Sequence, residues 1–372
     1  MDESTFPTES FIKWQPSPLM EWAKAIAGRG RYNLARSGVP SVTDVREIPG
    51  GPFEADLWGH NEGGHEGLKG CIAAMYGEAP ANVLLAQGAS ECNFLIAGAV
   101  LAGGGSAIVE TPVYEPLLRA IEVWADRVIR LPRRRENGFQ PDPDELRRLA
   151  AKDVRLVVLT DLHNPTHVAL EPARLQEIMT AARETGAMVM IDEVFLPMLR
   201  RDHRTHGHEF GAISVNGLDK SWGLDAIRVG WAVGPEEIVG RAYRLNNLLG
   251  VNQPYLTEDL AFRILSSRVA VESLIGRADR ANEGRALLDE FVEQTPEVRY
   301  VPSDGGISAV VELPEGISDR ELAERLLAEE HTVVFPGSFF EYPGTLRVSF
   351  GGGTEETREG FRRLSQRIRT GS

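Results

Sequence analysis

Between residues 83 and 233, short apolar runs alternate with segments of helical spacing. A run that is apolar at nearly every position is covered on both faces, which is typical of parallel strands joined by helices. The alternation therefore predicts an α/β fold with a mostly parallel sheet. The predicted strands are 83–86, 107–109, 127–131, 155–159, 188–191, 213–215 and 229–233. The predicted helices include 90–101, with Ser90 as N-cap, 116–124, and one that begins near Pro172.

The pattern changes near Pro254, where a long helical stretch rich in Ala, Leu, Arg and Glu begins and continues to about residue 294. Beyond it the sequence predicts a smaller α+β domain. Its expected elements are strands 307–313, 332–335 and 346–350, a helix at 319–329 and a last helix from residue 355. Before the first strand, helices are predicted at 19–27 and 64–75, on either side of a loop rich in Gly and Pro.

The composition excludes several classes of function. The chain has 372 residues with 40 basic and 54 acidic side chains, and a net charge of −14 argues against nucleic-acid binding through a basic face. Its two cysteines are too few for a disulfide framework or a thiolate metal site. No segment approaches the ~18 continuous apolar residues of a membrane span, and the acidic N-terminus does not resemble a signal peptide. We expect a cytoplasmic protein that binds neither nucleic acid nor membrane.

Two clusters of charged or metal-ligating residue types are not expected to form a binding site. The arginines at 133–135 are expected to be solvated loop charges, because the chain as a whole is acidic. His203, His206 and His208 lie in a polar segment without the carboxylate or cysteine spacing of a metal site, so no metal is expected.

Short polar motifs stand at the ends of the predicted strands, in one order along the chain. Each motif is weak alone, but all of them together, in this order, are a specific signal. They are Gly88-Ala89-Ser90-Glu91, Asn164-Pro165-Thr166, Ile191-Asp192-Glu193-Val194, Lys220 followed by Arg228, and Leu346-Arg347-Val348-Ser349-Phe350.

The residue types in these motifs suit a site that binds an anion and an aldehyde. A strand-to-helix turn at Ser90 favours a phosphate, although a plain capped helix explains it as well. Asp192 ends a buried strand and needs a cation or strong donors, such as a protonated pyridine nitrogen or a nearby arginine. Lys220, in a chain with few lysines, lies between two apolar strands and suits a nucleophile toward an aldehyde. Arg228 can return to the same pocket as a phosphate ligand. For both cations the alternative is a surface side chain.

In these motifs the chain resembles the class I/II aminotransferases, the fold type I family of enzymes that use pyridoxal 5'-phosphate. The resemblance extends from about residue 37 to the C-terminus. It implies an α/β fold type I transferase, in which a large domain with a mostly parallel seven-stranded sheet binds the cofactor and a smaller α+β domain follows. The implied boundaries are 1–44 for an N-terminal segment that contributes to the small domain, 45–275 for the large domain and 276–372 for the small domain.

The resemblance also implies a role for each matching residue. Lys220 is the expected catalytic residue and Schiff-base lysine, Asp192 the partner of the pyridine nitrogen, and Tyr114 the aromatic that stacks on the ring. The expected cofactor-binding residues are Ala89, Ser90, Tyr114, Asn164, Asp192, Lys220 and Arg228. The expected substrate-binding residues are Gly38, Asn164 and Arg347, with Arg347 gripping the α-carboxylate.

The implied reaction moves an amino group from an amino acid to a 2-oxo acid, in a homodimer with its sites at the interface. Four positions depart from the family pattern: Phe195 stands where Tyr is frequent, Gly217 and Asp219 stand where serines are frequent, and His167 stands where Gly follows Asn-Pro-Thr. These departures keep open another pyridoxal phosphate reaction, namely a cyclase of the capreomycidine-synthase type, a β-eliminating lyase or an amino-acid oxidase. A non-catalytic binding protein is disfavoured because the lysine, aspartate and arginine of the pattern are all present.

Overall fold

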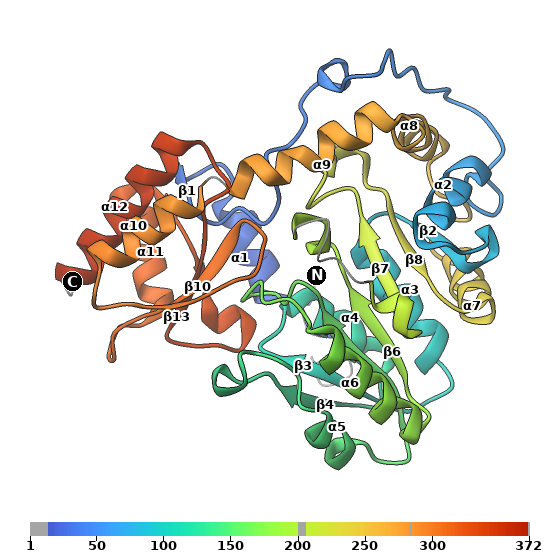
Figure 1. The fold of residues 1–372 in the computed structure, drawn as a ribbon, viewed down its shortest axis with the longest axis horizontal. Helices are drawn as coiled ribbons and strands as arrows, with labels where there is room; N and C mark the ends of the chain where they lie inside the picture. Colours follow the sequence, from blue (N-terminus) through green and yellow to red (C-terminus); the bar gives the residue numbers. More distant parts are fainter. Residues whose placement is uncertain (1–13, 200–205, 283, 371–372) are drawn as a thin grey trace, which may run out of the picture.

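A seven-stranded sheet forms the centre of the larger part of the molecule (Figure 1). The computed structural model describes residues 14–199, 206–282 and 284–370. The strand order is β2-β8-β7-β6-β5-β3-β4, and every neighbouring pair is parallel except the two pairs that β8 makes. The predicted mostly parallel sheet is therefore confirmed. Its strands are β2 (Val83–Ala86), β3 (Ser106–Thr111), β4 (Arg127–Pro132), β5 (Val154–Thr160), β6 (Met188–Asp192), β7 (Ile213–Gly217) and β8 (Gly230–Val233).

Helices cover both faces of this sheet, which explains why its strands are apolar without alternation. In β2, Leu84 and Ala86 pack in the cluster that includes α3 and α4, whereas Val83 and Leu85 pack in the cluster that includes α2 and α8. Helix α6 covers the same face as α8, farther along the sheet. The helices of this part are α2 (Glu66–Tyr76), α3 (Ala89–Leu101), α4 (Glu115–Trp124), α5 (Pro143–Leu149), α6 (Pro172–Thr185), α7 (Glu236–Asn246) and α8 (Tyr255–Leu265).

The smaller part is built on an antiparallel sheet of order β12-β13-β10-β9. Leu34, from the N-terminal segment, is fully buried in its core. Helix α9 runs from the larger part to the smaller one (Figure 1). The boundaries 1–44, 45–275 and 276–372 stay a prediction. The elements are α1 (Pro18–Ile26), β1 (Tyr32–Asn33), α9 (Arg268–Asn282), α10 (Arg285–Gln294), β9 (Arg299–Val301), β10 (Ser308–Glu312), α11 (Asp319–Glu330), β11 (Thr332–Val333), β12 (Phe335–Pro336), β13 (Thr345–Ser349) and α12 (Thr354–Thr370).

Two predicted elements are divided in the structure. The long helical stretch from residue 254 is three helices, α8, α9 and α10, and Ser266 and Ser267 separate the first two. The Ser266 hydroxyl donates to the Phe262 carbonyl at 2.7 Å, and the Ser267 hydroxyl accepts from the Ala270 amide at 3.4 Å, as at the start of a new helix. The predicted strand 332–335 is likewise two strands, since β11 pairs with β1 and β12 pairs with β13.

Arg133 corrects the expectation that residues 133–135 are all solvated. Its side chain and that of Glu110 are both 0% exposed, and Nη1 lies 2.9 Å from Glu110 Oε2. Glu110 Oε1 also accepts a hydrogen bond of 2.5 Å from the Thr160 hydroxyl. Burial raises the pKa of Glu110 from its ordinary value. Arg134 and Arg135 are exposed, as expected.

Replacement of Arg133 by Met should be strongly destabilising, because it leaves the Glu110 carboxylate buried without a cation. Breaking a buried pair in this way costs about 3–5 kcal/mol of the free energy of unfolding. The exposed neighbour provides the control: Arg134→Met should change the free energy by no more than about 0.5 kcal/mol. Urea denaturation of the two variants measures both values, and equal stability of the two would contradict the buried-pair interpretation.

Candidate active site

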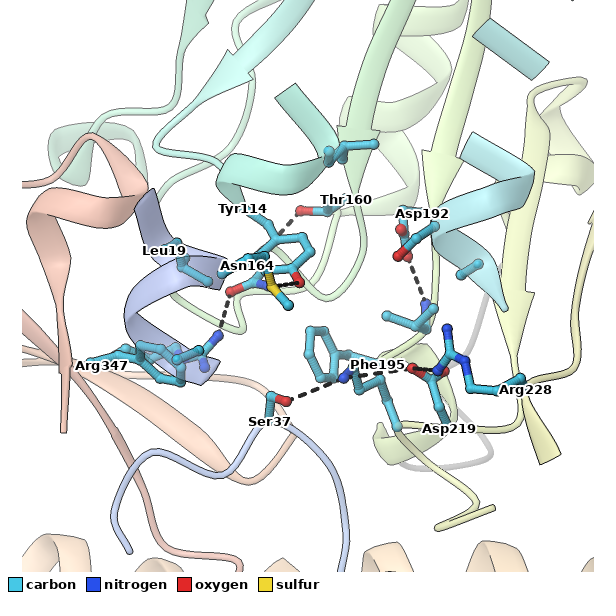
Figure 2. A pocket seen from close by; sticks show the side chains of 18 residues that line it. Leu19, Ser37, Tyr114, Thr160, Asn164, Asp192, Phe195, Asp219, Arg228 and Arg347 are labelled. Carbon is cyan, nitrogen blue, oxygen red and sulfur yellow. Dashed lines mark hydrogen bonds and ion pairs between the residues drawn. The ribbon is translucent and has the colours of Figure 1, made fainter. Parts of the chain in front are cut away.

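A cavity of about 280 Å³ lies where the carboxyl ends of the large sheet's strands meet α1 and the small sheet (Figure 2). Ligand sites of α/β proteins are found at this end of the strands. Eight of the nine predicted site residues line the cavity, and only Gly38 is absent from its described lining. The eight are Ala89, Ser90, Tyr114, Asn164, Asp192, Lys220, Arg228 and Arg347.

Lys220 reaches the cavity from the loop after β7. Its Nζ donates a hydrogen bond of 3.2 Å to the Ser37 hydroxyl and lies 3.5 Å from Asp219 Oδ2. The N-terminal segment lies against the lysine backbone, since the Val39 amide donates to the Lys220 carbonyl at 2.9 Å. A Cβ on Gly38 would lie 3.2 Å from Lys220 Cα. Gly38 therefore packs against the backbone of Lys220, and its substrate-binding role stays a prediction.

Asp192, at the end of β6, is a buried carboxylate on the cavity wall, with 9% of the residue exposed. Its Oδ2 accepts a hydrogen bond of 2.6 Å from Asn93 Nδ2, and its Oδ1 accepts one of 3.2 Å from the Val194 amide. Burial raises the pKa of Asp192 to about 6. Sequence reasoning missed Asn93, although its place four residues after Ala89 in α3 puts it on the same helix face as the cavity-lining Ala89.

Arg347 is the most deeply buried cation of the cavity, with 3% of the residue exposed. Its Nη1 donates a hydrogen bond of 3.0 Å to Asn164 Oδ1, and its guanidinium lies 4.7 Å from the centre of the Phe335 ring and 4.9 Å from that of Phe340. Burial lowers the pKa of Arg347 to about 10. Within the described ranges no carboxylate pairs with it. Because a guanidinium only donates, Asn164 turns Oδ1 toward it and its amide nitrogen away.

A strand-to-helix turn and Arg228 form the opposite end of the cavity (Figure 2). The predicted N-cap at Ser90 is wrong: α3 begins at Ala89 and Gly88 is its N-cap, with φ of 86°. A glycine is favoured there because L side chains rarely adopt this positive φ, and a Cβ would also lie 2.5 Å from Arg228 Nη2. Gly230 meets the same turn, where a Cβ would lie 2.5 Å from the Ala89 nitrogen. A helix N-terminus and an arginine together favour an anion.

Phe195 lines the cavity and rests on a histidine that sequence reasoning did not assign. The ring centres of Phe195 and His167 are 4.7 Å apart, and His167 is fully buried. His167 Nε2 lies 3.2 Å from the hydroxyl of Ser308 in the small sheet. Burial lowers the pKa of His167 to about 3, so the imidazole is neutral. Phe195 is thus held between the cavity and a contact that joins the two parts of the molecule.

The remaining wall of the cavity is apolar and comes largely from α1. Its members are Leu19, Met20, Ala23, Leu117 and Phe335. Glu115, at the start of α4, binds α1, because its Oε2 accepts a hydrogen bond of 2.7 Å from the Leu19 amide.

Comparison with known proteins identifies the family. Residues 60–364 match the family described as aminotransferase class I and II. The chain belongs to this family. Pyridoxal 5'-phosphate is the family's cofactor, and the site fits it: a lysine for the aldehyde, a buried carboxylate of raised pKa for the ring nitrogen, and an anion cradle at α3.

Individual members of the class I and II family resemble the chain over nearly its whole length. Capreomycidine synthase from Streptomyces vinaceus is 27% identical over 95% of this chain and 94% of its own length. The structure of the PLP-dependent cyclase OrfR in complex with Au has a TM-score of 0.85 at 28% identity, covering 99% of this chain and 100% of that one. A PLP-dependent aminotransferase from Streptococcus suis 89-1591 shares the fold, with a TM-score of 0.87 at 23% identity over 96% of this chain and 99% of its own.

Two further predictions concern metals and membranes. The described residues contain no cluster of three His, Cys, Asp or Glu side chains that could hold a metal ion. Of the histidines singled out in the sequence, His206 lies 2.7 Å from Glu193 and His208 lies 3.2 Å from Glu78, while His203 falls outside the described residues. None of the described helices is long and apolar enough to cross a membrane.

The raised pKa of Asp192 predicts how pH changes the stability of the cofactor-free protein. The folded state keeps a proton that the unfolded chain has released, so stability falls as pH rises from the ordinary pKa of 3.8 to about 6. A shift of about two units corresponds to a loss on the order of 3 kcal/mol. Asp192→Asn should not show this loss, which urea unfolding of both proteins across the window measures. Parallel pH profiles for the two proteins would contradict the assignment.

Proposed function

We propose that this chain is a pyridoxal phosphate-dependent aminotransferase that moves an amino group from an amino acid to a 2-oxo acid. One observation carries the proposal: Lys220 lines the same cavity as the buried cation Arg347. Arg228 lies at the opposite end of this cavity from Arg347 (Figure 2). A substrate held by its carboxylate at Arg347 and a cofactor held by its phosphate at Arg228 would meet beside the lysine.

Each of the chain's own groups then has a defined task. Ala89, Ser90 and Arg228 would hold the phosphate, Tyr114 would stack on the ring, and the Asp192 carboxylate would keep the ring nitrogen protonated. The bound cofactor supplies an electron sink that weakens the bonds at the substrate's α-carbon.

Substrate binding and proton transfer fall to three other groups. Arg347 would bind the substrate carboxylate through two parallel hydrogen bonds, and Asn164 holds Arg347 in place by its amide oxygen. Lys220 would hold the cofactor by its aldehyde carbon and, once freed by the substrate, would carry the proton that leaves the α-carbon. Gly38 belongs to the segment that lies against the lysine backbone and would hold its position.

The apolar wall indicates the kind of side chain that the substrate carries. All charged residues that line the cavity are already assigned to the cofactor or to the α-carboxylate, apart from Asp219 beside Lys220. The surface left for a side chain belongs to Leu19, Met20 and Phe335. We therefore propose an amino acid with an apolar side chain, since an unpaired charge against this wall would be costly.

Homodimer formation and a cytoplasmic location complete the proposal. Large apolar side chains are exposed in two segments next to α8: Leu57 is 83% and Trp58 77% exposed in the segment that hydrogen-bonds to it. Leu248 and Val251, 81% and 72% exposed, precede α8 in the chain. A second copy of the chain would cover such surface.

Cyclisation of an amino acid is a second candidate, supported by a specific observation. The two relatives at 27% and 28% identity that span almost the full chain are named a capreomycidine synthase and a PLP-dependent cyclase. A cyclase needs the same lysine, aspartate and arginine, because it also labilises bonds at the α-carbon.

A single-turnover assay of the holoenzyme separates the candidates. Transfer predicts that an apolar amino acid, without any 2-oxo acid, converts one equivalent of cofactor per site to its amine form and stops; a 2-oxo acid then restores the cofactor. The assay is repeated with amino acids that carry a hydroxyl or amino leaving group on the side chain. Continuing turnover of any of them without an acceptor would refute transfer, with loss of water or ammonia indicating cyclisation or elimination and oxygen consumption indicating oxidation. Lys220→Ala should abolish every outcome.

Arg347→Gln tests how the substrate is held. Two hydrogen bonds to a charged group at about 1.5–3 kcal/mol each predict a fall in kcat/KM for an amino acid of about 100-fold or more. The amine that lacks the carboxylate should react equally well with both proteins. Arg320 is the matched control, because it also lies over a phenylalanine ring, 4.5 Å from the centre of Phe339, but is exposed. Equal losses for the amine and the amino acid would contradict the assignment.

A further inference from the structure

Asp219 places a carboxylate at the end of the cavity where the proposed function puts the cofactor's phosphate. It lines the cavity beside Arg228, with Oδ2 3.8 Å from Arg228 Nη1 and 3.5 Å from Lys220 Nζ. The side chain is only 14% exposed. The proposed mechanism gives this carboxylate no task, although it places a negative charge where the site is expected to bind another anion.

One oxygen of this carboxylate is a buried acceptor without a donor. Among the described residues, Asp219 Oδ1 has no hydrogen-bond partner. It lies near the start of α3, because a Cβ built on Gly217 would be 3.3 Å from this oxygen and 3.5 Å from the Ala89 nitrogen. A buried acceptor without a donor is unfavourable, so a donor arriving with the ligand would be stabilising.

The charges around Asp219 make a doubly charged phosphate a poor occupant. Arg228 and the N-terminus of α3 favour an anion, but the carboxylate offsets the charge of Arg228. The other titratable groups near it are Lys220, whose nitrogen binds the cofactor's aldehyde carbon, and the more distant Asp192 and Tyr114, whose pKa values Asp219 helps to raise. A phosphate monoester has a second pKa of ~6, so free in neutral solution it is mostly a dianion.

We propose that Asp219 accepts a hydrogen bond from a protonated phosphate, so that this site binds the cofactor's phosphate as its monoanion. The proton gives the buried oxygen a donor and lowers the phosphate charge from −2 to −1, which weakens its repulsion by the Asp219 carboxylate. The inference rests on the proposed placement of the phosphate at Arg228 and α3. It predicts that cofactor affinity falls as pH rises above the second pKa of the phosphate, because binding must then take up a proton.

Phosphorus NMR of the full chain loaded with pyridoxamine 5'-phosphate tests the proposal directly. This probe forms no bond to Lys220, so the lysine's own titration does not enter. In the wild-type protein the bound phosphate should resonate at the monoanion position at neutral pH, and its pKa should lie at least about one unit above the free value of ~6. The phosphate bound to Asp219→Ser or to Asp219→Asn should resonate at the dianion position. A wild-type resonance at the dianion position throughout would overturn the proposal.

Equilibrium dialysis of the same probe gives an independent readout. The free probe titrates alike in every experiment, so the ratio of the wild-type dissociation constant to that of Asp219→Asn is compared. The ratio should rise about tenfold per pH unit between ~6 and the pKa of the bound phosphate. Asp225→Asn, which removes an exposed charge from the same loop, should leave the wild-type pH dependence unchanged. A ratio that does not change with pH would also overturn the proposal.

Arg228→Gln distinguishes a failure of this inference from a failure of the proposed phosphate site. Weaker binding of pyridoxamine 5'-phosphate in Arg228→Gln, together with a pH-independent Asp219→Asn ratio, refutes only the role of Asp219. Unchanged binding in Arg228→Gln refutes the placement of the phosphate itself. Thermal unfolding of each variant verifies that the chain is folded before binding is compared.

Discussion

Arg347 is a buried cation that no carboxylate of the described chain neutralises, and the rest of the site is arranged around it. The small sheet carries it, two phenylalanine rings lie under its guanidinium, and one amide oxygen accepts from it. Desolvation of a charge with so few partners is costly. A substrate carboxylate that pairs with Arg347 recovers part of that cost. The burial of Arg347 therefore destabilises the free protein but favours binding of an amino acid.

A series of hydrogen bonds connects Arg347 to the core of the large sheet. Asn164 accepts from Arg347, and its backbone amide donates to the Thr160 hydroxyl at 3.0 Å. Thr160 donates to Glu110, which is paired with Arg133. All of these groups are buried, so each bond is strengthened by the low local dielectric and each loss leaves a polar group unsatisfied. The Asn164 backbone is thus linked through Thr160 to an ion pair whose members are absent from the described lining of the cavity.

The groups that distinguish one pyridoxal phosphate reaction from another lie at the margins of this site. Transfer and cyclisation both begin with a bond broken at the α-carbon, so the lysine, the aspartate and Arg347 suit either. Around them lie the apolar wall on α1, Phe195 resting on a neutral His167, and Asp219 beside the lysine. The family membership of the chain therefore establishes its cofactor and fold, while the groups common to both reactions do not choose between them.

The sequence by itself determined where the strands of the large sheet lie along the chain and which residues stand at their ends. Burial on both faces makes a parallel strand continuously apolar, and the carboxyl ends of such strands meet at one edge, which is why Asp192 and Lys220 could be assigned to one site. Partners far apart in the chain leave no such local pattern. Only the tertiary structure decided that Arg133 meets Glu110, that Asn93 supports Asp192, and that Gly88 caps α3 beside Arg228. These contacts depend on which surfaces the fold brings together, and no periodicity in the sequence encodes that.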